Sequence, residues 1–222
     1  MKYKYNDGVF INYNNPEMYK HFLAIMKKLN RYKLLKLAYD NISVVYLDNN
    51  NFLKTSYFDD EENALHLIKN QLNIYTVAHE LGHKLQFMVN DEVSYEHPNN
   101  FKITEKLVQK YYDKYSNNVI IKGCENKEVA IAILDIINSW TQGNCSKLFN
   151  HPSHDIRYFE QDEELSMQEC LSNMWVLKLS KNNEQEIKEF KKDFAPMVRE
   201  FNKLAKKIEE QVIERVETLS LI

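Results

Sequence analysis

Residues 79–83 of this 222-residue chain read His-Glu-Leu-Gly-His, and their types and spacing can support metal chemistry. On a helix, residues four apart lie on one face, so the imidazoles of His79 and His83 can reach one metal ion. Imidazole nitrogens at this spacing are typical ligands of Zn²⁺. Glu80 is rotated by about 100° from His79, so it would act on a water at the metal rather than bind the ion. The motif therefore predicts a hydrolytic zinc site with Glu80 as its base.

A helix predicted at residues 73–88 must carry these histidines. Its apolar residues recur at helical spacing and form a stripe opposite the two imidazoles: Ile74, Val77, Ala78, Leu81, Leu85 and Met88. Such a helix can anchor in a core by one side and present its histidines from the other. The alternative is an ordinary amphipathic helix with two surface histidines.

A catalytic zinc site needs three protein ligands and leaves its fourth position to water. We select Glu169 as the third ligand, because it is the one charged residue in the apolar segment 165–177. A buried carboxylate is costly unless it is paired or bound to metal. The alternative is a structural carboxylate that pairs with a Lys or His. The other downstream candidates are Glu92, His97, Glu105, His151, His154, Asp162 and Glu164.

Hydrolysis at a carbonyl also needs a hydrogen-bond donor for the oxyanion that develops on the carbonyl oxygen. The segment 151–159 lies just before the predicted Glu169 helix and contains His154 and Tyr158. A neutral tyrosine or a cationic histidine can each donate such a bond, so both residues are candidate catalytic groups. The alternative is that both are surface residues of a loop.

The rest of the chain predicts an α+β fold. Residues 42–47 are β-branched and end in a run of turn residues, and two further short strands follow. Three short strands on tight polar turns predict a small antiparallel sheet. These expected strands are 42–47, 52–58 and 64–69. The expected helices are 16–39, 73–88, 101–116, 126–140, 164–180 and 184–219, with a kink or restart at Pro196.

Composition excludes several classes of protein. The formal charge of −3 gives no electrostatic reason to expect nucleic acid as a partner. No stretch approaches 18 uncharged apolar residues, so no membrane span is expected. The start lacks the apolar segment of a secretory signal, so we expect cytoplasmic synthesis, with delivery or secretion only by a dedicated system. Three cysteines without a CxxC motif favour a reducing compartment.

The segment Thr-Val-Ala-His-Glu-Leu-Gly-His (76–83) resembles the active-site helix of zincin metallopeptidases. Gln86 and Val89 stand where a metzincin would have its Gly and third His. Residues 164–174 instead resemble the glutamate helix of gluzincin-like peptidases, which implies a zincin-like fold with Glu169 as third ligand. This group includes the anthrax lethal factor and Pro-Pro endopeptidases, and metallopeptidase domains of phage-borne or polymorphic bacterial toxins. Lys84 departs from the family, which usually has an uncharged residue there, and its charge could tune zinc affinity.

The resemblance implies a zinc endopeptidase, acting as a bacterial toxin or effector, with one Zn²⁺ per chain. We expect a monomer that acts on a protein or peptide and is held by a cognate inhibitor or immunity protein. The expected domains are an N-terminal helical segment (1–40), a catalytic domain (41–182) and a C-terminal helical extension (183–222). The alternatives are a cytosolic repressor-cleaving protease of the ImmA type and a non-catalytic, zinc-stabilised phage or binding module.

Overall fold

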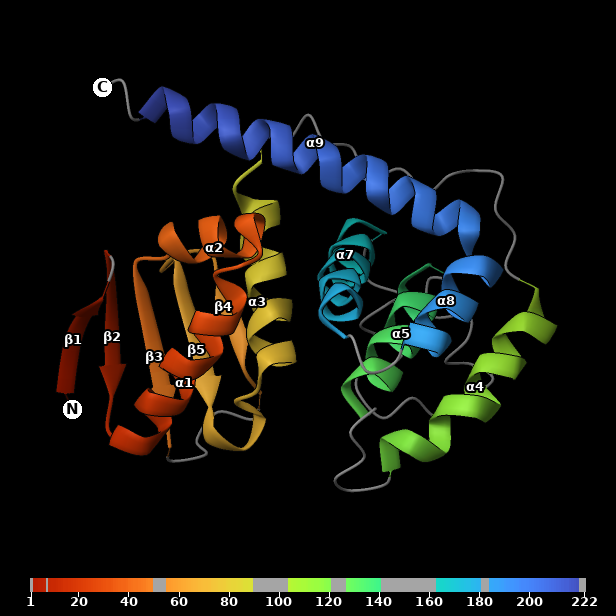
Figure 1. Ribbon diagram of the computed structural model, residues 1–222, viewed down its shortest axis with the longest axis horizontal. Helices are drawn as coiled ribbons and strands as arrows, with labels where there is room; N and C mark the ends of the chain where they lie inside the picture. The colour runs from red at the N-terminus through yellow and green to blue at the C-terminus, as the bar shows by residue number, and fades with distance from the viewer. Residues whose placement is uncertain are drawn as a thin grey trace. The chain divides into compact units, whose positions relative to one another are not determined.

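The computed structural model describes residues 2–6, 8–49, 55–89, 104–120, 127–140, 163–180 and 184–219. These residues have an α+β fold, as the sequence predicts (Figure 1). The chain forms two compact units, Met1–Asn90 with Gln211–Ile222, and Asp91–Glu210. The domain boundaries predicted near residues 40 and 182 remain predictions.

The first unit contains a five-stranded sheet in the order β1-β2-β3-β5-β4. Strands β2, β3 and β5 run parallel, whereas β1 and β4 pair antiparallel at the two edges. The prediction of a purely antiparallel sheet is therefore wrong. Helices between β2 and β3 return the chain to the same end of the sheet, so that β3 runs parallel to β2. Strand β4 pairs with the outer side of β5, and β3 and β5 are therefore parallel neighbours. The strands are β1 (Lys2–Asn6), β2 (Val9–Tyr13), β3 (Val44–Asp48), β4 (Tyr57–Asp59) and β5 (Ala64–Ile68).

Strands β1 and β2 lie within residues 1–40, a segment predicted to be helical, so that prediction is wrong for residues 2–6 and 9–13. Gly8 lies between the two strands with φ of +92°, a conformation that glycine adopts at no steric cost. In β2, Val9, Ile11 and Tyr13 are buried, whereas Phe10 is 54% exposed. This alternation is the period-two signal of a strand with one buried face.

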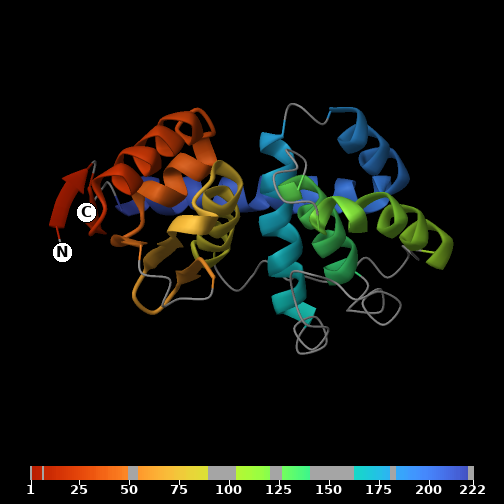
Figure 2. The same ribbon diagram turned by 90° about the horizontal axis from the view of Figure 1, so that it is seen from below.

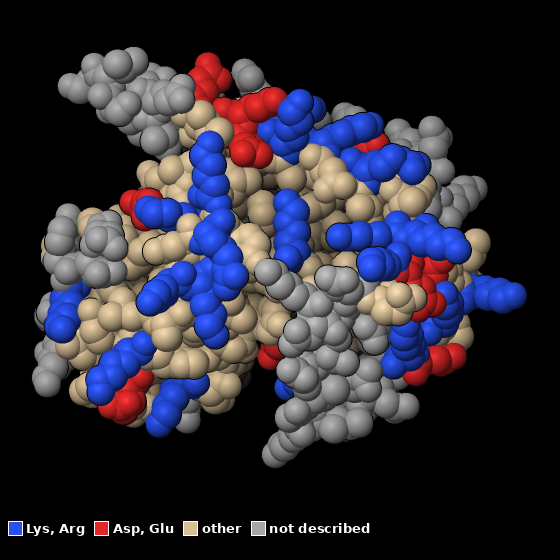
Figure 3. All heavy atoms as spheres, viewed as in Figure 1, with Lys and Arg blue, Asp and Glu red and all other residues tan. Residues whose placement is uncertain are grey.

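Helices α1 (Pro16–Leu29), α2 (Lys33–Asp40) and α3 (Ile74–Phe87) lie along one face of the sheet (Figures 1 and 2). The strands present buried aliphatic side chains to them, among which Ile11, Val45 and Leu65 are in register. Lys and Arg side chains gather on the solvent side of α1 and α2 in Figure 3. Burial on one side and charge on the other are what an amphipathic layer requires.

The predicted helix over 16–39 is two helices, because α1 ends at Leu29 and α2 begins at Lys33. At Asn30 the backbone N–H still bonds the Met26 carbonyl, and Tyr32 N–H then bonds the Leu29 carbonyl in a turn. An uninterrupted 24-residue helix would be about 36 Å long, whereas a five-residue strand spans about 17 Å. The break keeps the apolar side chains of both helices over the small sheet.

The elements described in the second unit are helices. None of the described helices of the chain is long and apolar enough to cross a membrane. In the second unit α5 packs against both α7 and α4. Phe194 separates α8 from α9, and α9 begins at Ala195, directly before Pro196, which confirms the restart predicted there. The described helices are α4 (Glu105–Ile120), α5 (Lys127–Trp140), α7 (Glu163–Leu179), α8 (Glu184–Asp193) and α9 (Ala195–Leu219), whose end from Gln211 belongs to the first unit.

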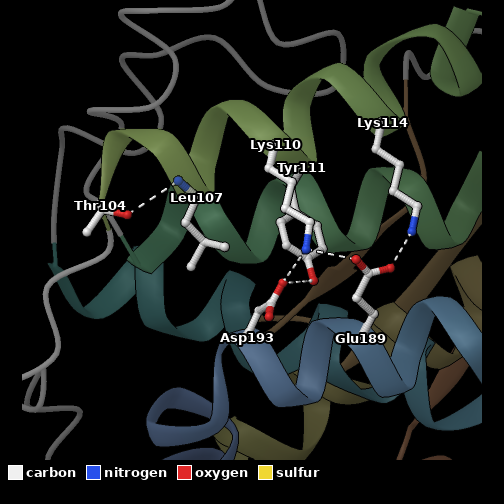
Figure 4. A network of polar contacts seen from close by, with 7 residues as sticks. All are labelled: Thr104, Leu107, Lys110, Tyr111, Lys114, Glu189 and Asp193. Atoms are coloured by element: carbon white, nitrogen blue, oxygen red, sulfur yellow. Dashed lines mark hydrogen bonds and ion pairs between the residues drawn. The ribbon is translucent and has the colours of Figure 1, made fainter.

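A polar network joins α4 to α8 (Figure 4). Lys110 Nζ lies 2.8 Å from Glu189 Oε1 and 2.7 Å from Asp193 Oδ2, and Lys114 Nζ lies 2.8 Å from Glu189 Oε2. The Tyr111 hydroxyl donates to Asp193 at 3.1 Å. Hydrogen bonds from Lys110 and then Lys114 lower the pKa of Glu189 from 4.5 to about 2. The network therefore favours the ionised carboxylate in the folded state.

Replacing Glu189 with Gln should lower the free energy of unfolding at neutral pH by about 1 kcal/mol or less, since partly exposed ion pairs contribute little. Because folding lowers this pKa, the contribution is complete above about 4.5 and is lost as the pH falls through about 2. Urea denaturation at neutral and strongly acidic pH tests this. Glu200→Gln is the control, since Glu200 pairs only with Lys203 among the described ion pairs. An equal loss of unfolding free energy in Glu189→Gln and Glu200→Gln would contradict the stabilising role of the network.

Candidate metal centre

Local sequence places the His-Glu-Leu-Gly-His motif in the body of α3, which confirms the predicted helix. Asn73 caps the helix, because its side-chain oxygen accepts from Tyr75 N–H at 2.8 Å and Thr76 N–H at 3.0 Å. The helix continues to Phe87 and therefore carries the whole motif. Buried residues of the predicted stripe anchor α3 in the core of the first unit: Val77, Ala78, Leu81, Leu85 and Met88.

The two imidazoles converge on one point. His79 Nε2 and His83 Nε2 lie 3.1 Å apart, with ring centroids separated by 4.8 Å and planes at 81°. Two nitrogens bound tetrahedrally to one zinc ion at 2.0–2.1 Å would lie about 3.3 Å apart. The observed separation fits a shared zinc ion. The same separation would also fit a hydrogen bond between two neutral imidazoles, which is the non-metal interpretation.

Glu80 completes the described group. Glu80 is only 6% exposed, and ligand atoms of His79, Glu80 and His83 all lie within 4.8 Å of one another. Within the described residues, these three are the one group of His, Cys, Asp or Glu side chains that could hold a metal ion. A carboxylate beside two convergent imidazoles can serve as a proton acceptor close to a bound cation.

Glu169 is buried in α7 at 2% exposure, which confirms the burial expected from its apolar surroundings. Asn173 Nδ2 donates to Glu169 Oε1 at 2.9 Å and to its backbone carbonyl at 3.1 Å. Burial, and then the charge of Glu169, raise the pKa of Cys170 to about 12, so this cysteine stays a thiol. Glu169 belongs to the second unit and the histidines to the first, so its role as third ligand remains a prediction.

His154 and Tyr158, the candidate oxyanion donors, lie outside the described residues, as do Glu92, His97, His151 and Asp162. Two other histidines have structural contacts. The His21 imidazole donates to the Leu72 carbonyl at 3.1 Å. His66 is stacked between Tyr46 and Tyr57, with centroid distances of 4.7 and 4.5 Å, and burial lowers its pKa.

Lys84, the departure from the family pattern, contacts the turn that joins β4 to β5. Its ammonium donates to Asn63 Oδ1 at 2.7 Å and lies 5.6 Å from the centroid of the Phe58 ring. The sequence suggests only a charge beside the metal at this position. No local pattern connects residues 63 and 84, because the contact depends on how the sheet and α3 pack.

Comparison with known proteins finds no match to a protein-family model, a curated protein or a solved structure.

The protein should bind about one zinc ion per chain, because α3 presents two convergent imidazoles. His79→Ala should weaken zinc binding by more than about 100-fold, since it removes a ligand rather than a neighbour of one. Competition with a chromophoric chelator measures both values. His21→Asn, a change to a histidine bonded elsewhere in the same unit, should bind zinc like the wild type. Equal zinc affinity of His79→Ala and His21→Asn would contradict a zinc site at His79 and His83.

Proposed function

We propose that this protein is a zinc-dependent endopeptidase of the zincin type. The observation that supports the proposal most is the 3.1 Å approach of His79 Nε2 to His83 Nε2 on α3. A buried Glu80 carboxylate beside that pair adds the base that hydrolysis needs. Simple metal storage would not require such a base.

The position of β4 supports a peptide as substrate. This strand forms the edge of the described sheet, pairs on one side with β5 and contacts α3. The outer edge of a strand offers backbone N–H and C=O groups that an extended peptide can pair with. A main chain bound along β4 would lie beside the helix that carries the two histidines.

In the proposed mechanism a zinc ion, when bound, supplies a Lewis acid that polarises the carbonyl and acidifies water. His79, His83 and Glu169 would hold the ion. Glu80 accepts a proton from the attacking water and then donates it to the amine nitrogen that leaves. The oxyanion would be stabilised by a hydrogen bond from His154 or Tyr158.

The fold and the resemblance support the class of enzyme. A small mixed sheet with an edge strand beside the motif helix is compatible with the zincin-like architecture that the motif implies. The proposed biological role, a bacterial toxin or effector restrained by an inhibitor, rests on the resemblance of the two motif segments. A repressor-cleaving protease would use the same centre, whereas a non-catalytic zinc module would not need Glu80.

Glu80→Gln should bind zinc like the wild type and retain the fold, because this residue is proposed as base and not as ligand. Cleavage of a peptide library should fall by about 10²–10⁴-fold, the range for loss of a general acid-base group. Mass spectrometry of the library before and after incubation measures it. Cleavage at the wild-type rate would reject the mechanism, and no cleavage by zinc-loaded wild type would favour the non-catalytic module.

Glu169→Ala should weaken zinc binding sharply and abolish cleavage, whereas Glu169→Gln should weaken binding less because it keeps an oxygen but not the charge. The rival ligands are tested with Glu164→Ala and His97→Ala, which should both bind zinc like the wild type. Zinc affinity of the purified variants is the measurement. If Glu169→Ala binds normally and a rival variant does not, the third ligand has been assigned to the wrong residue.

A further inference from the structure

Lys84 follows the second histidine directly and is half-buried, although a charge at this point of α3 must leave water at a cost. Its ammonium is directed to Asn63 Oδ1, 2.7 Å away, and it also lies over the ring of Phe58. Both partners belong to the β4–β5 hairpin, Phe58 in β4 itself and Asn63 in the turn. The side chain therefore joins the histidine helix to the edge strand and its turn.

Asn63 is a suitable anchor because all parts of its carboxamide are bonded. While its oxygen accepts from Lys84, its Nδ2 donates to the Asn41 carbonyl at 2.9 Å and to Ser43 Oγ at 3.0 Å. Its backbone carbonyl accepts from Ser43 N–H at 3.0 Å. Asn63 also has φ of +50°, a left-handed conformation that asparagine tolerates better than most residues. The turn is thus bonded to two other segments of the chain, residues 41–43 and α3.

Phe58 provides the second attachment. It pairs in register with the buried Leu65, so it lies on the helix-covered face of the sheet. Its ring lies 5.6 Å from that of Phe87, one turn beyond Lys84 on α3. An edge strand has a backbone partner on one side only. Here β4 is also fastened to α3 through Lys84 and Phe87.

We infer that Lys84 is a positioning residue of the proposed peptidase site, which holds the edge strand β4 at a fixed place relative to the metal-binding histidines. The inference rests on the proposed function. A peptide aligned along β4 would have its scissile carbonyl placed by this strand, and small misplacements of a reacting group cost much rate. The charge of Lys84 acts on the hairpin through Asn63, which explains the departure from an uncharged residue after the second histidine.

Lys84→Met tests the inference, because it keeps an apolar stem over Phe58 and removes the donor to Asn63. Hydrogen exchange of peptides covering residues 57–63 and 41–43 should become faster. The kcat/KM for a cleaved peptide should fall about 10- to 100-fold, mainly in kcat, as expected for misaligned substrate. Zinc affinity should stay within about threefold of wild type, less than the 10- to 100-fold typical when a ligand's own partner is removed.

Three further variants separate positioning from general stability. Lys84→Arg can still donate to Asn63 and should restore both kcat and slow exchange. Asn63→Gly tolerates the positive φ but lacks the carboxamide that Lys84 binds. Adding Lys84→Met to this variant should therefore cause little further loss of kcat and little further increase in exchange. Lys36→Met is the matched control, because Lys36 is ion-paired with Asp40 within α2. It should exchange and cleave like the wild type.

Normal exchange at 57–63 together with normal kcat/KM in Lys84→Met would overturn the inference. So would a large loss of zinc affinity with unchanged exchange, since Lys84 would then act on the metal. The exchange measurement needs no substrate. If the zinc-loaded wild type cleaves no peptide, the proposed function fails, while exchange still shows whether Lys84 holds the hairpin.

Discussion

The candidate centre depends on one constraint, that two side chains four residues apart on a helix converge only while that turn remains regular. His79 and His83 meet this constraint because α3 is capped by Asn73 and anchored by the buried residues of its opposite side. Any loosening of that packing would let the imidazoles diverge. The apolar stripe is therefore a condition for the convergence of the two histidines.

The mixed sheet gives α3 a rigid support and places an edge strand beside it. The parallel strands β2, β3 and β5 form the centre, where aliphatic side chains in register bury the face under the helices. The short β4 lies outside them and has one backbone neighbour, so its place depends on side-chain contacts with α3. Asn63 and Lys84 supply those contacts at the turn end.

In the second unit, several buried residues of α5 and α7 are polar and recur at helical spacing. In α5 these are Asp135, Asn138 and Ser139, and in α7 they are Glu169, Ser172 and Asn173, all nearly inaccessible to solvent. The two helices pack against each other. Most buried polar groups in proteins have hydrogen-bond partners, so each such stripe constrains how its helix is oriented. Glu169 accepts a hydrogen bond from Asn173 through one of its carboxylate oxygens.

The sequence by itself determined the features that rest on local periodicity: the α3 helix, its histidine face, the burial of Glu169 and the α+β class. It did not determine which strands are neighbours, because pairing depends on distant segments, and so the parallel core of the sheet was not anticipated. The break between α1 and α2 was likewise decided by the size of the sheet beneath them. The bond from Lys84 to Asn63 has no sequence signal, since residues 21 positions apart meet only when the hairpin packs on α3.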